Sequence, residues 1–274
     1  MILERAKGFE PSTSTLARLR STPELRPLYF YVMLLYLYYN NNINFYMTKF
    51  LKKIIKLIIN KVNPNFLRKR ELKNYVKRFL PIEFVEHLQK LGENDTVIDI
   101  GANTGIVSEC LANTGAYTIS FEPNKKALVQ LKKVSARYKN IEVHECAAGI
   151  KDREVKLYLH KDVGRNDDDL TQASSLKSDK PNVSKFKYDK IREIDFALFL
   201  DSLNKYVELI KIDIEGYEVE LINHLIDNNS LNKIGKIYLE THETKFKALE
   251  ESTLTLKKRI KENRLEKKFI FEWP

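Results

Sequence analysis

The chain has 274 residues, of which 43% are hydrophobic, enough for one α/β domain with an additional segment and a real core. It carries a formal net charge of +10 at pH 7, and its two cysteines, Cys110 and Cys146, lack the spacing of a metal site or a disulfide framework. We therefore expect reduced thiols in a cytoplasmic protein, which argues against a disulfide-stapled secreted fold.

Residues 1–46 differ in composition from the rest of the chain. Residues 4–27 have no apolar period, and they resemble the product of a tRNA gene translated by mistake, which would make Met47 the true start. The apolar run 28–39 is shorter than the roughly 20 residues of a spanning helix and lacks the order of features in a signal peptide. We expect a mistranslated or disordered segment, with an anchor or signal as alternatives.

Residues 47–92 are predicted to form a basic amphipathic helical region, with one helix ending at Pro64 and a second following it. Residues 47–80 contain 11 Lys or Arg and a single acid, a surplus equal to the net charge of the whole chain. Either this surface contacts an anionic membrane, or the helices pack on the next domain with their lysines in water. The remaining chain is near neutral, which argues against nucleic acid as a partner.

A further amphipathic helix is expected over residues 81–91, with His87 as a surface residue without a partner. The stretch 96–105 then predicts a buried strand, a tight glycine turn and the start of a helix over 104–112, the arrangement that cradles nucleotides at strand ends. An ordinary strand-to-helix turn is the alternative.

The glycine turn lacks the Gly-x-Gly-x-x-Gly spacing that approaches a pyrophosphate. The acid at Asp99, just before the turn through Gly101 and Gly105, would repel phosphate but suit an ammonium group. The turn therefore favours a cationic, phosphate-free nucleoside, S-adenosylmethionine (SAM), over NAD.

A second strand is predicted over residues 117–121, and it ends at Glu122. This acid lies 17 positions after Gly105, where it is placed to accept hydrogen bonds from both ribose hydroxyls. A helix over 125–138 and a strand over 141–144 are expected to follow. The glycine turn and Glu122 together indicate nucleoside binding.

An insertion is expected after residue 149, with strands over 155–159 and 186–194 around a polar loop, 163–179. A loop of about 20 residues inside a compact domain is usually functional or disordered. Its three consecutive aspartates, 167–169, are interpreted as solvated charge, since consecutive residues do not easily face one ion. We therefore predict no metal site in the chain.

Strands over 207–213 and 235–240 are predicted to bring acids and an imidazole to one edge of the sheet. Asp213 ends the first strand, Glu215 lies just beyond it, and His242 follows the second strand. Any of the three would serve as a base for a hydroxyl. The structural alternatives are that Glu218 caps its helix and that His242 bonds to backbone. A divalent ion held by the carboxylates is possible but has no support in the sequence.

Five sequence blocks, VIDIGANTG, FEPN, ECAAG, IKIDIEGYE and YLETH, run in this order through residues 96–242. Together they resemble the FkbM family of SAM-dependent methyltransferases, and IKIDIEGYE is the most specific block. The resemblance implies an α/β fold, a Rossmann-like SAM-methyltransferase sandwich with a mostly parallel sheet over residues 93–274, preceded by N-terminal helices. The residues it assigns to SAM are Asp99, Gly101, Asn103, Gly105, Glu122, Asn124 and Ala147.

Within this resemblance, Ala147 lines the adenine pocket, and Ser175 matches a serine beside the cofactor. Asp213, Glu215 and His242 become the catalytic residues. The family's sheet has two strands after 235–240, the last antiparallel, yet only one is evident here, over 268–273 after a charged helix at 243–263.

The resulting prediction is an O-methyltransferase that acts on a hydroxyl of a sugar, glycolipid or secondary metabolite, so that its partner is a small-molecule or glycan acceptor. The acceptor class is implied by the resemblance. The alternative is a non-catalytic nucleoside-binding or membrane-surface module on the same fold. A nucleic-acid methyltransferase is disfavoured, because the Asn/Asp-Pro-Pro-Tyr-type motif for base amines is absent after the 207–213 strand.

Overall fold

A computed structural model describes most of the chain from residue 64 onward, in five ranges: 64–161, 174–178, 180–244, 246–271 and 273. The expectations for residues 1–63 and for the three aspartates at 167–169 therefore lie outside the described residues. The backbone divides into two units between Asn74 and Tyr75, and the second unit, Tyr75–Pro274, contains both sheets. No helix in the described ranges has both the length and the apolar character needed to cross a membrane.

The basic helix expected after Pro64 is present as α4 (Pro64–Phe79), which begins at this proline. Proline is tolerated in the first turn of a helix, because the amide it lacks would have no partner inside the helix there. The next helix, α5 (Ile82–Leu88), is shorter than the predicted 81–91 segment.

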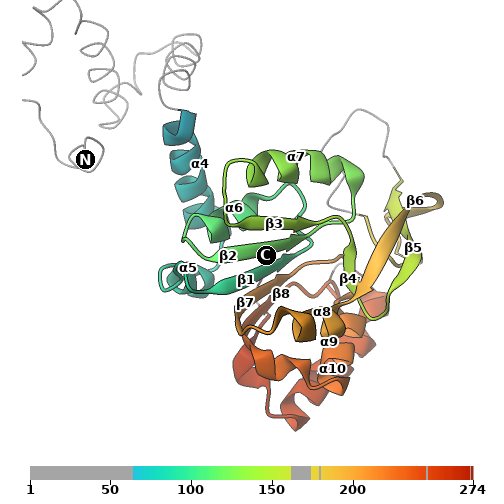
Figure 1. Cartoon of the computed structure of the whole chain (residues 1–274). Coiled ribbons are helices and arrows are strands. Elements are labelled where there is room, and N and C mark those ends of the chain that lie inside the picture. The colour runs from blue at the N-terminus through green and yellow to red at the C-terminus, as the bar shows by residue number, and fades with distance from the viewer. Residues whose placement is uncertain (1–63, 162–173, 179, 245, 272, 274) are drawn as a thin grey trace, which may run out of the picture. The chain divides into compact units, whose positions relative to one another are not determined.

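The main sheet has six strands, and every neighbouring pair is parallel (Figure 1). Their order is β3-β2-β1-β7-β8-β9. Their bounds are β1 (Thr96–Ile100), β2 (Tyr117–Phe121), β3 (Ile141–His144), β7 (Val207–Ile212), β8 (Ile234–Leu239) and β9 (Phe269–Ile270). All five residues of β1 are buried, as expected for a central strand covered on both faces. The predicted Rossmann-like α/β fold is confirmed.

Helices cover the two faces of this sheet, with α6 and α7 on one face and α8, α9 and α10 on the other (Figure 1). Their bounds are α6 (Ile106–Ala112), α7 (Lys125–Ser135), α8 (Phe196–Leu203), α9 (Glu218–Asp227) and α10 (Glu250–Glu262). The described residues also form three short 3-10 turns: η4 (Ser230–Lys233), η5 (Lys247–Leu249) and η6 (Glu266–Lys268). No helix was predicted at the position of α8.

The helix α5 packs on β8 through an aromatic cluster. Phe84 is fully buried, and its ring meets Tyr238 and Trp273 edge-on, with centroids 4.8 Å apart in both pairs. His87 lies 3.3 Å from the Tyr238 hydroxyl through its Nδ1 atom. The expectation that His87 has no partner is therefore wrong, because a residue more than 150 positions away supplies it.

The insertion forms a separate three-stranded sheet in the order β4-β6-β5. β5 (Arg153–His160) and β6 (Val183–Asp195) pair antiparallel, while β4 (Ala147–Gly149) runs parallel to β6. Both long strands extend beyond their predicted bounds. The strand β4 was not predicted, because its Ala and Gly content gives no strand signal.

A buried carboxylate joins the second sheet to the start of α9. Glu193 is fully buried on β6 and accepts hydrogen bonds from the Arg153 side chain at 2.7 Å, the Ile150 amide at 3.0 Å and the Tyr217 hydroxyl at 3.1 Å. A buried carboxylate with one cationic and two neutral donors is stable in the interior. Glu193 therefore fixes the insertion against the main domain next to the Asp213 loop.

The C-terminal end of the sheet differs from what the resemblance implies. In the described residues one strand, β9, follows β8, and it pairs parallel to β8. The helix α10 and the turn η6 return the chain to the sheet edge in the same direction, as a crossover connection does. An antiparallel final strand is not found in this part of the chain.

Candidate active site

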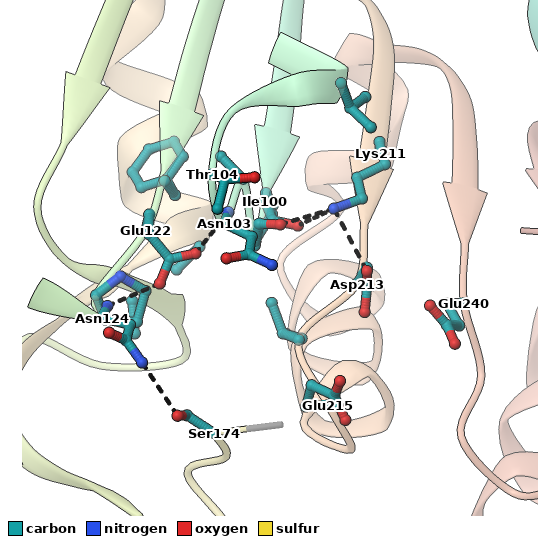
Figure 2. Close-up of a pocket in the computed structure, with 18 of the residues that line it drawn as sticks. Ile100, Asn103, Thr104, Glu122, Asn124, Ser174, Lys211, Asp213, Glu215 and Glu240 are labelled. Atoms are coloured by element: carbon teal, nitrogen blue, oxygen red, sulfur yellow. Dashed lines mark hydrogen bonds and ion pairs between the residues drawn. The ribbon is translucent and has the colours of Figure 1, made fainter. Parts of the chain in front are cut away.

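A cavity of about 350 Å³ lies at the carboxyl ends of β1, β2, β7 and β8 (Figure 2). This volume is within the range of small-molecule sites. The predicted site residues that line it are Gly101, Asn103, Glu122, Asn124, Ala147, Asp213 and Glu215, together with Ser175. Asp99, Gly105 and His242 are outside this lining. Its apolar part includes Tyr75, Phe79, Leu80, Leu157 and Trp273.

The glycine turn after β1 is folded against the loop after β7. Gly101 has φ +75°, and a Cβ atom there would overlap the carbonyl oxygen of Asp213 and lie 2.9 Å from its carbonyl carbon. Only glycine permits this close approach. Gly105, with φ +87°, lies against Leu131 of α7, so it is required for helix packing rather than for lining the cavity.

Glu122 lies at the end of β2, beside the glycine turn, as predicted. Its two carboxylate oxygens accept the backbone N–H groups of Asn103 and Asn124, each at 2.7 Å (Figure 2). Burial raises the pKa of Glu122 to about 7, although the two amide donors favour the charged form. The carboxylate is therefore held rigidly, with further acceptor capacity toward the cavity.

Asn124 has two contacts that explain its position. Its side-chain oxygen caps α7 by accepting the amides of Lys126 at 2.9 Å and Ala127 at 3.4 Å. Its amide nitrogen donates to the Ser174 hydroxyl at 3.1 Å, which brings the segment 174–178 to the cavity. Asparagine at this position thus both starts a helix and anchors the insertion.

Ser175 joins the insertion to the other end of the cavity. It is buried, and its hydroxyl donates to the backbone oxygen of Glu215 at 2.8 Å. Its backbone pairs with Tyr158 of β5 in an isolated bridge. Ala147, the first residue of β4, lies on the cavity wall, where its small side chain leaves space.

Asp99 does not face the cavity, which corrects the expectation that it meets an ammonium group of the ligand. Its side chain is fully buried, accepts the Ser108 hydroxyl at 2.6 Å, and lies 3.3 Å from the ammonium of Lys211. The ammonium group that Asp99 faces therefore belongs to the protein. Residues on a buried strand point to alternate faces, and the sequence does not show which face carries the site.

Lys211 on β7 is a site residue that the sequence analysis missed. Its ammonium donates to the Gly101 carbonyl at 2.7 Å and lies 3.6 Å from Asp213 on the cavity side (Figure 2). Burial opposes its charge, but the carboxylates of Asp99 and Asp213 outweigh burial and raise the pKa of Lys211. The sequence does contain a signal for Lys211, namely a charged residue inside an otherwise apolar strand. A buried charge requires a partner, so such a residue points to a polar site.

The acids after β7 and the imidazole after β8 come together, as predicted. His242 is buried, and its Nε2 atom lies 3.4 Å from Glu215, 3.6 Å from Glu240 and 3.8 Å from Asp213. On the far side of the ring, Nδ1 lies 3.0 Å from Glu218. Burial disfavours the charged imidazole, but the surrounding carboxylates outweigh it and raise the pKa of His242.

Glu218 is the first residue of α9, but the helix has no side-chain cap, so the capping alternative is wrong. Its carboxylate accepts the backbone amides of Ile214 at 3.0 Å and Gly216 at 2.9 Å. It is therefore anchored to the Asp213 loop while it faces His242. Lys180 of the insertion pairs with Glu215, and its ammonium lies 4.6 Å from the Phe246 ring centroid.

The arrangement has two functional ends. At one end Glu122 and the glycine turn offer a fixed acceptor beside an open backbone, which suits a ribose. At the other end Asp213 and Glu215 present carboxylates to the same cavity, with His242 behind them. Such a site can hold a nucleoside and a second, hydroxyl-bearing molecule side by side.

Three comparisons with known proteins gave different results. Among solved structures, a precorrin 8W decarboxylase from Methanobacterium thermoautotrophicum is similar at 16% identity and a TM-score of 0.34, covering 65% of this chain and 72% of that chain. A likeness at this TM-score adds nothing to the assignment. No curated protein matches the sequence. The family model described as the methyltransferase FkbM domain matches residues 99–263, which is more than half of the chain. The chain belongs to the FkbM methyltransferase family.

Proposed function

We propose that this methyltransferase uses SAM as its donor and methylates a hydroxyl group of a sugar, glycolipid or secondary metabolite. The observation that carries the proposal is that Glu122 at one end and Asp213 with Glu215 at the other line a single cavity. The donor would lie along the glycine turn, and the acceptor would lie against the Asp213 loop. The acceptor class follows the family resemblance.

The residues present fit SAM in three respects. The cavity has the volume of a small-molecule site, the glycine turn lines it through Gly101, and Glu122 has acceptor capacity left for ribose hydroxyls. In addition, carboxylates outnumber ammonium groups around the cavity, which suits a donor that carries a sulfonium. SAM would supply an electrophilic methyl group bound to that sulfonium.

The protein's contribution to methyl transfer is orientation and removal of a proton. Because the positive charge on sulfur disappears during the displacement, no new anion has to be stabilised. Holding two reactants in line can supply about 7–11 kcal/mol of the barrier. A hydroxyl is a poor nucleophile at neutral pH, so a base within hydrogen-bond reach adds about 10²–10⁴-fold.

Asp213 and Glu215 are better placed than His242 to accept that proton directly. Both carboxylates line the cavity, whereas His242 lies outside the lining and behind them. We assign the proton-accepting role to these two carboxylates. His242 then serves as a positioning residue that holds their geometry.

The proposal is tested with the purified full chain and SAM carrying a deuterated methyl group. Calorimetry first measures SAM binding, and cell extracts are then screened by mass spectrometry for products that gain the labelled methyl. We expect binding and at least one labelled hydroxyl compound. A folded protein that does not bind SAM would overturn the proposal. Binding without any labelled product would favour the non-catalytic nucleoside-binding alternative.

A further inference from the structure

We infer that Asp213, Glu215 and His242 form a binding site for a divalent cation of the Mn²⁺ class at the acceptor end of the cavity. Each residue offers one ligand atom, and these atoms all lie within 4.8 Å of one another. The inference rests on the proposed function, since the ion would hold and polarise the acceptor oxygen. It departs from the sequence-based expectation of no metal site.

Two of the three ligand distances suit a shared ion, and the third, between Asp213 and Glu215, is at most 4.8 Å. Ligand atoms about 2.1 Å from one metal ion are separated by roughly 3.0 Å at right angles and 4.2 Å when opposite. The His242 Nε2 atom lies 3.4 Å from Glu215 and 3.8 Å from Asp213, inside this range. Glu240, at 3.6 Å from the same nitrogen, is near enough to become a fourth ligand.

His242 has the surroundings of a metal-binding histidine. Its side chain is fully buried, and in the part of the chain that the structure describes neither ring nitrogen makes a hydrogen bond of good geometry. The Nδ1 atom lies 3.0 Å from Glu218, whose carboxylate is itself anchored by two backbone amides. In metal sites a carboxylate commonly lies behind the second ring nitrogen of a histidine ligand, and Glu218 lies at that position.

The charge around this position is strongly negative. Four carboxylates lie within 4 Å of the His242 ring nitrogens, from Asp213, Glu215, Glu218 and Glu240. The ammonium groups of Lys180 and Lys211 each pair with one of them. Carboxylates gathered in this way would attract a divalent cation.

The mixed ligand set selects the class of ion. Carboxylates suit Mg²⁺, Ca²⁺ and Mn²⁺, whereas imidazole suits transition metals, so a site with both favours Mn²⁺ among these. An ion bound here would coordinate the acceptor hydroxyl and favour its deprotonation, with the proton passing to a neighbouring carboxylate. The cavity face of Asp213 and Glu215 leaves room for that acceptor ligand.

Lys180 makes the inference sharply testable, because its ammonium competes for the same carboxylate. It pairs with Glu215, and only 3% of its side chain is exposed. If a cation binds to Asp213, Glu215 and His242, replacing Lys180 by methionine removes a competing charge and strengthens metal binding. A purely structural cluster of ion pairs would show no such gain.

The experiment titrates MnCl₂ into the full chain after treatment with a chelator, with calorimetry and electron paramagnetic resonance as readouts. We expect one Mn²⁺ per chain, affinity at least 10-fold weaker in Asp213→Asn and Glu215→Gln, and tighter binding in Lys180→Met. The matched control is Asp201→Asn, which removes a carboxylate of α8 that lies 2.7 Å from the Lys233 ammonium. This variant should bind Mn²⁺ as the wild type does. Thermal melts establish that each variant is folded.

Two results would overturn the inference. The first is that the wild type does not bind Mn²⁺ at millimolar concentration. This includes the case in which only Lys180→Met binds Mn²⁺, because the Lys180 ammonium would then occupy the position proposed for the metal ion. The other is binding that Asp213→Asn leaves unchanged. SAM titrations of the metal-free protein distinguish the two proposals. If the protein binds SAM and transfers methyl groups but does not bind Mn²⁺, only the metal site is refuted. If it binds Mn²⁺ but not SAM, only the proposed donor is refuted.

Discussion

Glu122 accepts the backbone N–H of Asn103 at 2.7 Å, so the end of β2 is bonded directly to the turn that follows β1. Asn103 is in the left-handed region, with φ 47°, and this conformation aims its amide at the carboxylate. The Asn124 amide holds the second oxygen at the same distance. The nucleoside end of the cavity therefore depends on one acid that joins two strand ends.

Replacing Glu122 by alanine should weaken SAM binding by about 10–100-fold, because hydrogen bonds to a charged acceptor contribute about 1.5–3 kcal/mol. Glu122→Gln should lose less, since the amide oxygen still accepts. Calorimetry measures both affinities. Glu145→Ala, which removes an exposed acid paired with Lys132, is the control and should bind normally. Equal affinity in Glu122→Ala and the wild type would refute the ribose contact.

The raised pKa of Glu122 predicts a dependence of stability on pH. In the folded state the Glu122 carboxyl keeps its proton up to about pH 7, whereas the pKa of an unperturbed glutamate is 4.5. The folded state thus binds more protons than the unfolded state between these values, so stability is highest below pH 4.5 and falls as pH rises toward 7. The free energy of unfolding falls by at most about 3 kcal/mol over this pH interval.

Urea unfolding at pH 5 and pH 8 measures this effect as the difference between the wild type and Glu122→Gln. Because other groups titrate equally in both proteins, the difference isolates Glu122. We expect the wild type to lose more stability than the variant on going to pH 8. A parallel change in the two proteins would contradict the burial of this carboxyl in a neutral form.

Gly101→Ala should destabilise the fold by about 2–4 kcal/mol, through a disfavoured φ and an overlap with the Asp213 carbonyl. Gly92→Ala is the matched control, because a Cβ there has no atom within 4 Å, and its effect should stay within about 0.5 kcal/mol. Denaturant unfolding compares the two. Similar stabilities would mean that the β1 and β7 loops can separate without cost.

Glu215→Gln should reduce turnover by about 10²-fold or more while changing SAM affinity by less than about threefold. The reason is that Glu215 lies at the acceptor end of the cavity and Glu122 at the donor end. Single-turnover kinetics and calorimetry on the same preparation measure both quantities. A loss of SAM affinity equal to the loss in rate would place Glu215 at the donor instead.

Much of the fold and the site could be predicted from sequence because the signals are local. The strand over 141–144 was predicted with its exact bounds, and the glycine turn with Glu122 indicated one end of the cavity. Asp213, Glu215 and His242 were expected together, since parallel strands bring their carboxyl ends to one edge. No long-range information is needed for these inferences.

The other features of the fold and the site depend on long-range contacts, which sequence spacing does not reveal. Asp99 and Lys211 are paired across neighbouring strands, and their direction relative to the cavity is set by sheet register. β4 is a strand because β6 pairs with it, although Ala147, Ala148 and Gly149 have little strand propensity of their own. His87 has its partner because α5 packs on β8.

The position of Lys211 has a consequence for how such a site evolves. Its ammonium lies between Asp99 under the donor end and Asp213 at the acceptor end, so both halves of the cleft share one cation. A lineage that adopts a new acceptor by replacing Asp213 removes one of the two carboxylates beside Lys211 and leaves Asp99 as its remaining counter-ion. A substitution at the acceptor end is thereby felt at the donor end through Lys211.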